Sequence, residues 1–213
     1  MSAPLVKICG LNDAAAVDAA VAAGADYLGF ILFPKSPRNV WPAEAGQLAA
    51  RKGRAKSVAV MVDPTEPELA GVLTEMKPDI IQLHGQESPE RCLDAKSYAM
   101  QGVWKALGVS EPADLNNAAR YRSLVDGFVF DAKPPKDADR PGGLGAAWDY
   151  SILKGFDPGG PWLLAGGLSV ETVAGAVSRS GAPGVDVVSG TESAPGVKDP
   201  DKIRAFIAAV KGA

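Results

Sequence analysis

The stretch LVKICGLNDAAAVDAAVAAGADYLGFIL (residues 5–32) contains the unit that decides the fold. Its two ends, LVKIC and DYLGFIL, are short apolar runs with the composition of buried strands. Between them, from Asn12 to Ala23, lies an alanine-rich segment that opens with the polar residues of a helix start. The stretch therefore predicts a strand, a helix and a second strand parallel to the first.

The same alternation repeats along the rest of the chain. Strands are predicted at LVKIC, DYLGFIL, SVAVMV, DIIQLH, GVWKAL, GFVF, WLLA and GVDVV. Helices are predicted at about residues 12–23, 42–51, 67–76, 89–96, 112–121, 147–153, 170–178 and 200–211. Eight such units in 213 residues match the count and size of a compact (β/α)8 barrel, the TIM barrel of the α/β class.

An open, doubly wound parallel sheet is the alternative fold. The barrel is favoured because eight units fit it without a remainder, and because no GxGxxG motif follows the first strand, as a dinucleotide-binding sheet usually requires. No linker or low-complexity segment interrupts the alternation. We therefore expect residues 1–213 to form one barrel domain.

Composition narrows the classes of partner and location. The formal net charge is −3 without a long run of one sign, so we expect no nucleic-acid partner. No segment approaches the roughly 18 apolar residues of a membrane span, so we expect no membrane partner. The first residues, MSAPLVKICG, lack the features of a secretory signal, and a cytoplasmic, reducing location is the expectation. A monomer or a homodimer is expected.

Cysteine and histidine are scarce in this chain. Cys9 and Cys92 form neither a disulfide framework nor a CxxC pair, and His84 is the only histidine. We therefore expect no metal site. The polar candidates follow the predicted strands, where a barrel of this kind places its active site, and they are Cys9, Arg38, Asp63, Gln82, His84, Asp131, Lys133, Asp186 and Ser189.

Strand alternation places Lys7 and Cys9 on one face of the first strand and Val6 and Ile8 on the other. The apolar pair suits the helix side, which leaves Lys7 and Cys9 pointing into the barrel. A buried ammonium needs an acidic partner, and its charge favours the thiolate of a nearby cysteine by lowering its pKa. A small buried hydrophobe is the alternative interpretation of Cys9.

Asp131 ends the apolar strand GFVFD, where a rigid support could carry a catalytic carboxyl. Alternatively it caps the following loop or pairs with Lys7 or Lys133. Gln82 and His84 occupy alternate positions at the end of the fourth strand. They are predicted either to contact a substrate or to form a satisfied inward-facing polar pair.

Glycine-rich loops predict a phosphate site. Such loops follow the seventh strand in WLLAGGLSVET and the eighth in GVDVVSGTES, and PGGLG adds further amides or a lid. Glycine lets backbone N–H groups approach an anion closely, and these are the loops that usually hold phosphate in this fold. The candidate residues are Gly143, Gly145, Gly166, Gly167, Ser189 and Gly190.

Several longer motifs stand in a specific order along nearly the whole chain. They are KICG from Lys7, ADYLGFILFPKSPRNV from Ala25, VDP from Val62, IQLHG from Ile81, FDAK from Phe130, LAGGL from Leu164, VDVVSGTE from Val185 and PGVKD from Pro195. In this order the chain resembles the phosphoribosylanthranilate isomerase family of tryptophan biosynthesis.

The resemblance implies conversion of N-(5-phosphoribosyl)anthranilate into 1-(2-carboxyphenylamino)-1-deoxyribulose 5-phosphate. This is an Amadori rearrangement, an aldose–ketose isomerisation with no metal or organic cofactor. The resemblance also implies that Cys9 is the general base and Asp131 the general acid, that Arg38 lies near the anthranilate moiety and that Asp186 belongs to the substrate site. The predicted substrate-binding residues are Lys7, Arg38, Gln82, His84 and Asp186.

The implied chemistry needs an acid and a base in different protonation states. The acid protonates the ribose ring oxygen, the ring opens to an iminium, and the base removes the C2 proton. Burial would keep Asp131 protonated, and the charge of Lys7 is expected to lower the pKa of Cys9. Arg38 suits the anthranilate carboxylate because a planar guanidinium can bind it through two hydrogen bonds.

Some residues depart from the family pattern. Leu144 stands where a hydroxyl or amide side chain is usual, WDY replaces an FDW-like segment, and Val188 and Thr191 replace a serine and a valine. The phosphate site is therefore expected to depend on backbone amides and Ser189. Two other functions remain as alternatives. One is the histidine-pathway isomerase, which uses an aspartate in place of Cys9 and shows internal two-fold similarity, and the other is a non-catalytic barrel that binds a sugar phosphate.

Overall fold

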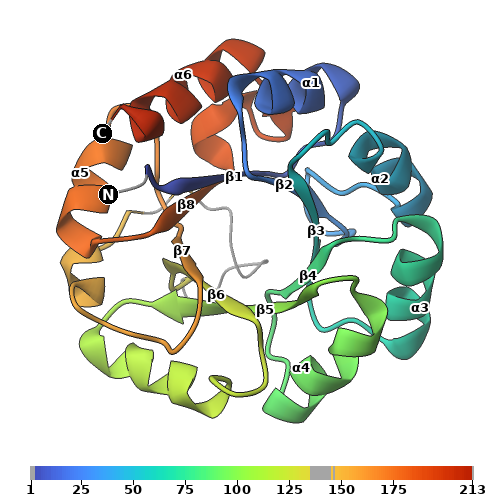
Figure 1. Cartoon of the computed structure of the whole chain (residues 1–213), viewed down its shortest axis with the longest axis horizontal. Helices are drawn as coiled ribbons and strands as arrows, with labels where there is room; N and C mark the ends of the chain where they lie inside the picture. Colours follow the sequence, from blue (N-terminus) through green and yellow to red (C-terminus); the bar gives the residue numbers. More distant parts are fainter. Residues whose placement is uncertain (1–2, 135–144, 146, 213) are drawn as a thin grey trace.

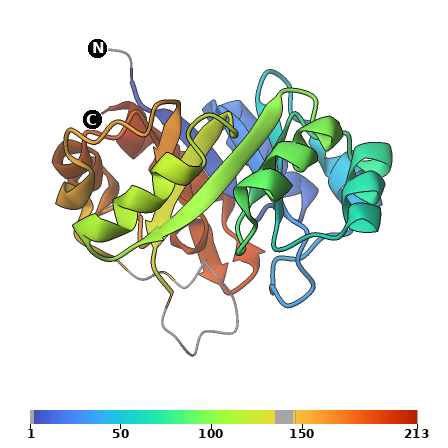
Figure 2. The same cartoon turned by 90° about the horizontal axis from the view of Figure 1, so that it is seen from below.

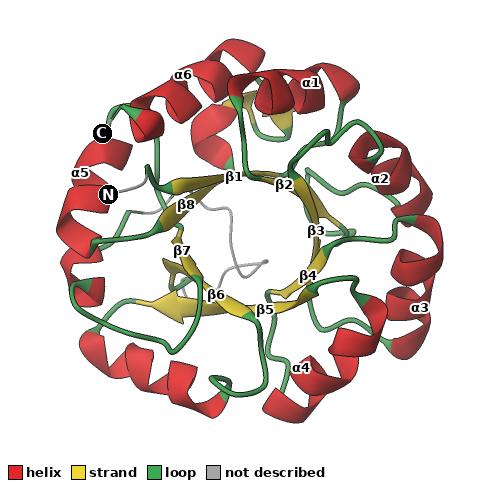
Figure 3. Ribbon diagram, viewed as in Figure 1, coloured by secondary structure: helices red, strands yellow, loops and turns green. Residues whose placement is uncertain are grey.

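The structure is a computed structural model that describes residues 3–134, 145 and 147–212. Its eight principal strands form one closed parallel barrel in sequence order, with the helices outside it (Figures 1 and 3). The strands are β1 Leu5–Cys9, β2 Tyr27–Ile31, β3 Lys56–Met61, β4 Ile80–Leu83, β5 Gly102–Val109, β6 Gly127–Ala132, β7 Trp162–Leu164 and β8 Gly184–Val187. The predicted (β/α)8 barrel is confirmed.

Barrel closure depends on the pairing of β1 with β8. Leu5 lies opposite Gly184, Lys7 opposite Asp186 and Ile8 opposite Val187, all in parallel register. This register brings the first strand of the chain beside the last principal one, so residues far apart in sequence share one wall of the barrel.

The outer layer combines α-helices with shorter 3-10 helices. The α-helices are α1 Ala14–Ala23, α2 Pro42–Ala49, α3 Glu66–Glu75, α4 Pro89–Ala95, α5 Val173–Ser180 and α6 Pro200–Lys211. The 3-10 helices are η1 Lys96–Tyr98, η2 Pro112–Arg120, η3 Tyr150–Leu153 and η4 Ser189–Thr191. Within the described residues, every helix is too short or too polar to span a membrane.

Helix boundaries differ from the sequence pattern where side chains bind the backbone. Asp13, not Asn12, caps α1 by accepting the N–H of Ala16 at 2.8 Å. The segments predicted as helices at residues 112–121 and 147–153 form the 3-10 helices η2 and η3. Aspartates near their starts, Asp114 and Asp149, bind nearby N–H groups, and such local bonds favour tight turns over a regular α-helix.

Side chains alternate across the barrel wall as predicted. Val6 and Ile8 belong to the large apolar layer between sheet and helices. Cys9 belongs to a second, smaller cluster inside the barrel, together with Val58, Val60, Ile80, Trp104, Ala106, Val129, Leu163 and Ala165. Within the described residues, these apolar side chains fill the barrel interior below the C-terminal ends of the strands.

A small antiparallel hairpin, β9 Glu192–Ala194 and β10 Val197–Lys198, follows β8 and η4. The sequence analysis did not predict it, because strands of three and two residues carry too little alternation to be recognised. In the view of Figure 2 the hairpin and the loop after β2 lie at the same end of the barrel, opposite the N-terminus.

Candidate active site

A pocket of about 720 Å³, its open mouth included, lies at the C-terminal ends of the strands. It brings together predicted residues that are far apart in the chain, and they are Cys9, Arg38, Gln82, His84, Asp131, Gly145, Gly166, Gly167, Asp186 and Ser189. Ile31, Phe33, Val60 and Val62 add an apolar side to the wall.

Lys7 and Asp186 form a buried ion pair beside Cys9. Lys7 Nζ donates to Asp186 Oδ2 at 2.9 Å, and Lys7 is 0% exposed. The sequence offered Asp131 as one partner for Lys7; the partner is Asp186, because it lies opposite Lys7 on the neighbouring strand. Lys7 is not among the residues that line the pocket, and its contact with the substrate stays a prediction.

Burial raises the pKa of the Cys9 thiol. The charges of Lys7 and Lys198 oppose this shift, while the charge of Asp186 adds to it. The prediction that Lys7 lowers the pKa of Cys9 is therefore correct for the effect of the lysine itself. It is wrong for the sum of all effects, which raises the pKa of Cys9. Burial alone would lower the pKa of Lys7, but Asp186 and Cys9 outweigh it and raise that pKa, so the ammonium stays charged.

Asp131 faces His84 across the pocket. Its Oδ1 accepts the N–H of Ala132 at 2.7 Å, and its Oδ2 lies 3.5 Å from His84 Nε2. On the other side of the imidazole, Gln82 Nε2 lies 3.0 Å from Nδ1. An amide nitrogen only donates, so Nδ1 accepts and Nε2 carries the hydrogen that faces Asp131. Gln82 and His84 are thus an inward polar pair that also lines the pocket.

Two buried oxygens of pocket-lining residues, Gln82 Oε1 and Asp186 Oδ1, have no hydrogen-bond partner within the part of the chain that the structure describes. An unpaired buried acceptor costs roughly 1–3 kcal/mol.

The loop after β7 passes through two residues in the left-handed region, Gly166 at φ 85° and Gly167 at φ 64°. A Cβ on Gly166 would lie 2.9 Å from Asp131 Oδ1 and 2.7 Å from the nitrogen of Ala132, so glycine is needed for this close approach. Glycine is also needed at position 190 for close packing, because a Cβ on Gly190 would lie 2.0 Å from the carbonyl oxygen of Leu168.

Two of the remaining candidates of the phosphate region, Gly145 and Ser189, lie close together. Gly145 and Ser189 line the pocket, and a Cβ on Gly145 would lie 3.2 Å from Ser189 Oγ. Gly143 and Leu144 lie outside the described residues. Thr191 is fully buried and donates to the carbonyl of Val188 at 3.0 Å, so its hydroxyl stabilises the loop from behind.

The WDY segment anchors the loop after β7. Trp148 Nε1 donates to the carbonyl of Ala165 at 3.0 Å, and the Tyr150 hydroxyl donates to the carbonyl of Gly166 at 2.7 Å. These two aromatic residues therefore hold the backbone that forms one wall of the pocket.

Arg38 lies at the rim with its side chain across Gly10, where a Cβ would be 3.0 Å from Arg38 Cδ. Its guanidinium forms a bidentate pair with Glu192, Nε to Oε1 at 2.7 Å and Nη2 to Oε2 at 2.9 Å. The predicted carboxylate-binding arginine is thus already held on one edge by a carboxylate of the chain itself.

Sequence reasoning missed four buried charged residues around the strand ends. They are Glu87, Lys105, Glu192 and Lys198, and Lys105 Nζ lies 3.0 Å from Glu87 Oε2. Lys105 stands inside the apolar run GVWKAL, just as Lys7 stands inside LVKIC. The same pattern could therefore have predicted that Lys105 is buried. The two glutamates lie outside the eight predicted strands, and nothing local marks them as buried.

Across residues 3–134, 145 and 147–212, no group of three or more His, Cys, Asp or Glu side chains is placed to hold a metal ion. The pocket instead offers a thiol, a carboxyl group, an imidazole, a guanidinium and two glycine loops.

The fold is a TIM barrel, and its pocket lies at the C-terminal ends of the strands, where barrels of this kind place their active sites. A family model described as N-(5'phosphoribosyl)anthranilate (PRA) isomerase matches residues 6–209. The chain belongs to this family of isomerases.

Relatives and solved structures agree over the full length. The N-(5'-phosphoribosyl)anthranilate isomerase of Paracoccus denitrificans is 53% identical over 205 residues, which cover 95% of each chain. That of Paramagnetospirillum magneticum is 50% identical and covers 97% of each. The crystal structure of phosphoribosyl anthranilate isomerase from Thermotoga maritima matches with a TM-score of 0.88 at 33% identity and 100% coverage of both chains.

Proposed function

We propose that this chain converts N-(5'-phosphoribosyl)anthranilate into 1-(2-carboxyphenylamino)-1-deoxyribulose 5-phosphate, with Asp131 as the general acid and Cys9 as the general base. The observation that carries the proposal is the meeting of a buried thiol and a carboxyl group in one pocket with glycine loops, in a chain of this family. A phosphoribosyl anthranilate isomerase in complex with reduced 1-(o-carboxyphenylamino)-1-deoxyribulose 5-phosphate is 31% identical, with a TM-score of 0.85 and 100% coverage of both chains.

Asp131 opens the ribose ring in the first step. Its carboxyl proton passes to the ring oxygen, the bond from C1 to that oxygen breaks, and an iminium forms between C1 and the anthranilate nitrogen. The Nε2 hydrogen of His84 faces the Asp131 carboxylate that remains and can stabilise its negative charge.

Cys9 acts in the second step. The thiolate removes the proton from C2, and the electron pair of that bond neutralises the iminium to give an enolamine, which tautomerises to the ketone. The iminium lowers the barrier because it accepts the electron pair. The raised pKa of the buried Cys9 makes the thiolate a stronger base than an exposed one, at the cost of a smaller ionised fraction at neutral pH.

The other pocket residues suit the remaining parts of the substrate. Gln82 Oε1 and Asp186 Oδ1, which lack partners within the described residues, would accept hydrogen bonds from ribose hydroxyls. The glycine loop after β7, together with Ser189, would hold the phosphate. The guanidinium of Arg38 would bind the anthranilate carboxylate.

The purified chain should consume phosphoribosylanthranilate in buffer that contains a chelator and no added cofactor. Loss of the substrate's fluorescence measures the reaction. A chain that binds the sugar phosphate without converting it would contradict the proposal and favour a non-catalytic binding barrel.

A further inference from the structure

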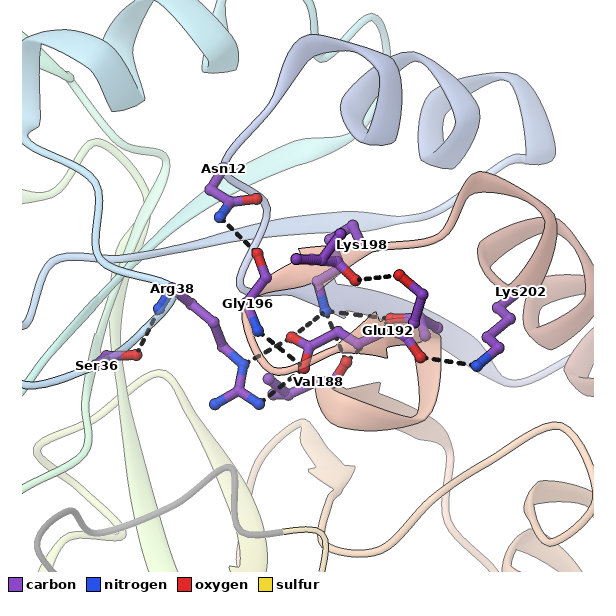
Figure 4. Close-up of polar contacts among 11 residues, drawn as sticks. Asn12, Ser36, Arg38, Val188, Glu192, Gly196, Lys198 and Lys202 are labelled. Atoms are coloured by element: carbon purple, nitrogen blue, oxygen red, sulfur yellow. Dashed lines mark hydrogen bonds and ion pairs between the residues drawn. The ribbon is translucent and has the colours of Figure 1, made fainter.

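The hairpin of β9 and β10 carries buried charges that the reaction above does not use. Glu192 begins β9 and its side chain points toward Arg38, while Lys198 ends β10 and its side chain points toward Glu192 and Val188 (Figure 4). Arg38 and Glu192 are 154 residues apart in the chain, yet their side chains are both only 4% exposed. The contact is therefore a product of the closed fold rather than of local sequence.

Glu192 occupies one edge of the Arg38 guanidinium. The two hydrogen bonds, from Nε at 2.7 Å and from Nη2 at 2.9 Å, fix the plane of the group. Figure 4 shows the third nitrogen, Nη1, turned away from Glu192. Because Arg38 lines the pocket, this geometry selects which edge of the guanidinium is available to a ligand.

Lys198 is a second lysine or arginine side chain beside Glu192, and it contacts the same oxygen, Oε1, as Arg38 Nε. Its Nζ lies 3.3 Å from Glu192 Oε1 and donates to the carbonyl of Val188 at 2.6 Å. Burial alone would raise the pKa of Glu192, but Arg38 and Lys198 outweigh it and lower that pKa. Burial lowers the pKa of Lys198, although the charge of Glu192 opposes this shift. When Lys198 is protonated, two cations surround one carboxylate and leave an excess positive charge that a substrate anion can offset.

The backbone around Glu192 is held from several sides. Its carbonyl accepts from Lys202 Nζ at 2.8 Å, and the N–H of Gly196 points to its Oε2 at 3.4 Å. The carbonyl of Gly196 accepts from Asn12 Nδ2 at 2.9 Å, which links the hairpin to the loop that follows Cys9 (Figure 4). The hairpin is thereby tied to the loop that follows β1, the strand that carries Cys9.

We propose that Glu192 is a positioning residue: it holds the Arg38 guanidinium so that its remaining edge receives the carboxylate of the substrate. The inference rests on the proposed function, which supplies the carboxylate-bearing substrate. Without Glu192 the guanidinium can rotate about its side-chain bonds and lies beside an uncompensated Lys198. Recognition of the carboxylate is then weakened, while the rest of the pocket still binds the sugar phosphate.

The test compares two ligands on Glu192→Gln and on the wild type by titration calorimetry. One is reduced 1-(o-carboxyphenylamino)-1-deoxyribulose 5-phosphate, and the other is the same molecule without the carboxyl group. The ratio is the Kd of the ligand without the carboxyl group divided by the Kd of the ligand that has it. A large ratio therefore means strong recognition of the carboxylate. Since a hydrogen bond to a charged group contributes on the order of a tenfold change in affinity, the ratio should fall about tenfold in Glu192→Gln.

Two further variants separate positioning from general damage. Glu75→Gln alters an exposed glutamate at the end of α3 and should keep the wild-type ratio. In an Arg38→Met background, Glu192→Gln should leave the ratio unchanged, because its effect passes through Arg38. If Glu192→Gln does not fold, Glu192→Asp retains the charge but shortens the reach to Arg38, and it should reduce the ratio by a smaller factor.

Three results would overturn the positioning role. Glu192→Gln could weaken the binding of both ligands equally, or the folded Glu192 variants could keep the wild-type ratio of Kd values. The third result is a lower ratio in the Arg38→Met, Glu192→Gln double variant than in Arg38→Met alone. A wild type that binds both ligands equally would overturn the carboxylate site of the proposed function itself. The two failures are therefore distinguishable.

Discussion

At the scale of single residues, the protonation of Cys9 follows from three neighbours and from burial. Burial raises the pKa of the thiol, Lys7 and Lys198 lower it, and Asp186 raises it. Strand alternation was enough to predict that Lys7 and Cys9 share the barrel interior. The neutralising role of Asp186 could not be predicted, because its position opposite Lys7 depends on the pairing of the first strand with the last.

Lys7→Met should shift the pH profile of kcat/KM to higher pH. In the proposed mechanism the active base is the thiolate, so kcat/KM should rise with pH through the pKa of Cys9. Lys7 is the charge that stabilises the Cys9 thiolate most, and Asp186 is a charge that destabilises it. Without the Lys7 cation, the pKa of Cys9 should therefore rise. The profile is measured by the fluorescence assay at constant ionic strength.

Lys56→Met provides the control, since Lys56 is exposed at the opposite end of the barrel, on the first residue of β3. It should reproduce the wild-type profile. A Lys7→Met profile that stays in place or moves to lower pH is incompatible with Lys7 acting on Cys9.

At the scale of elements, sequence patterns located the strands well and the shorter helices less well. Each predicted strand is present, because apolar runs of this composition are buried on both faces of a parallel sheet. The segment at residues 112–121 has the helical spacing but forms η2, in which Asp114 binds the N–H groups of Ser110 and Glu111. Such side-chain contacts compete with the regular helix pattern and are not visible in hydrophobic periodicity.

Asp114 should stabilise the fold in a pH-dependent way. Burial would raise its pKa, but hydrogen bonds from Lys133 and Ser110 outweigh burial and lower the pKa to about 2. Since an unfolded aspartate titrates near ~3.9, the contribution is complete above that pH and is lost as the pH falls toward about 2. It amounts to roughly 2 kcal/mol at neutral pH.

Urea unfolding of Asp114→Asn and the wild type between pH 7 and pH 3 checks this expectation. The variant should have a lower free energy of unfolding than the wild type at pH 7, and the difference between the two should become smaller below pH 4. Asp94→Asn, at an exposed position on α4, should change the free energy of unfolding by less than about 0.5 kcal/mol. A gap that is constant with pH would show that Asp114 acts through packing alone.

At the scale of the whole molecule, the candidate site exists only because the barrel closes. Cys9, Asp131 and Asp186 come from β1, β6 and β8, and each stands at an inward position near the strand end. The rule that active sites lie at this rim predicted their meeting. The Glu192 contact to Arg38 was not predictable, because it needs the unrecognised hairpin and a separation of 154 residues.

The central claim is that Cys9 and Asp131 are the base and the acid of one isomerisation. The most direct measurement is the turnover of phosphoribosylanthranilate by Cys9→Ala and Asp131→Asn, with Cys92→Ala as the control for loss of the other buried thiol. We expect kcat to fall by roughly 10²–10⁴-fold in each of the first two variants and to stay within a few-fold of wild type in the third. Turnover within a few-fold of wild type in Cys9→Ala or in Asp131→Asn would contradict the account.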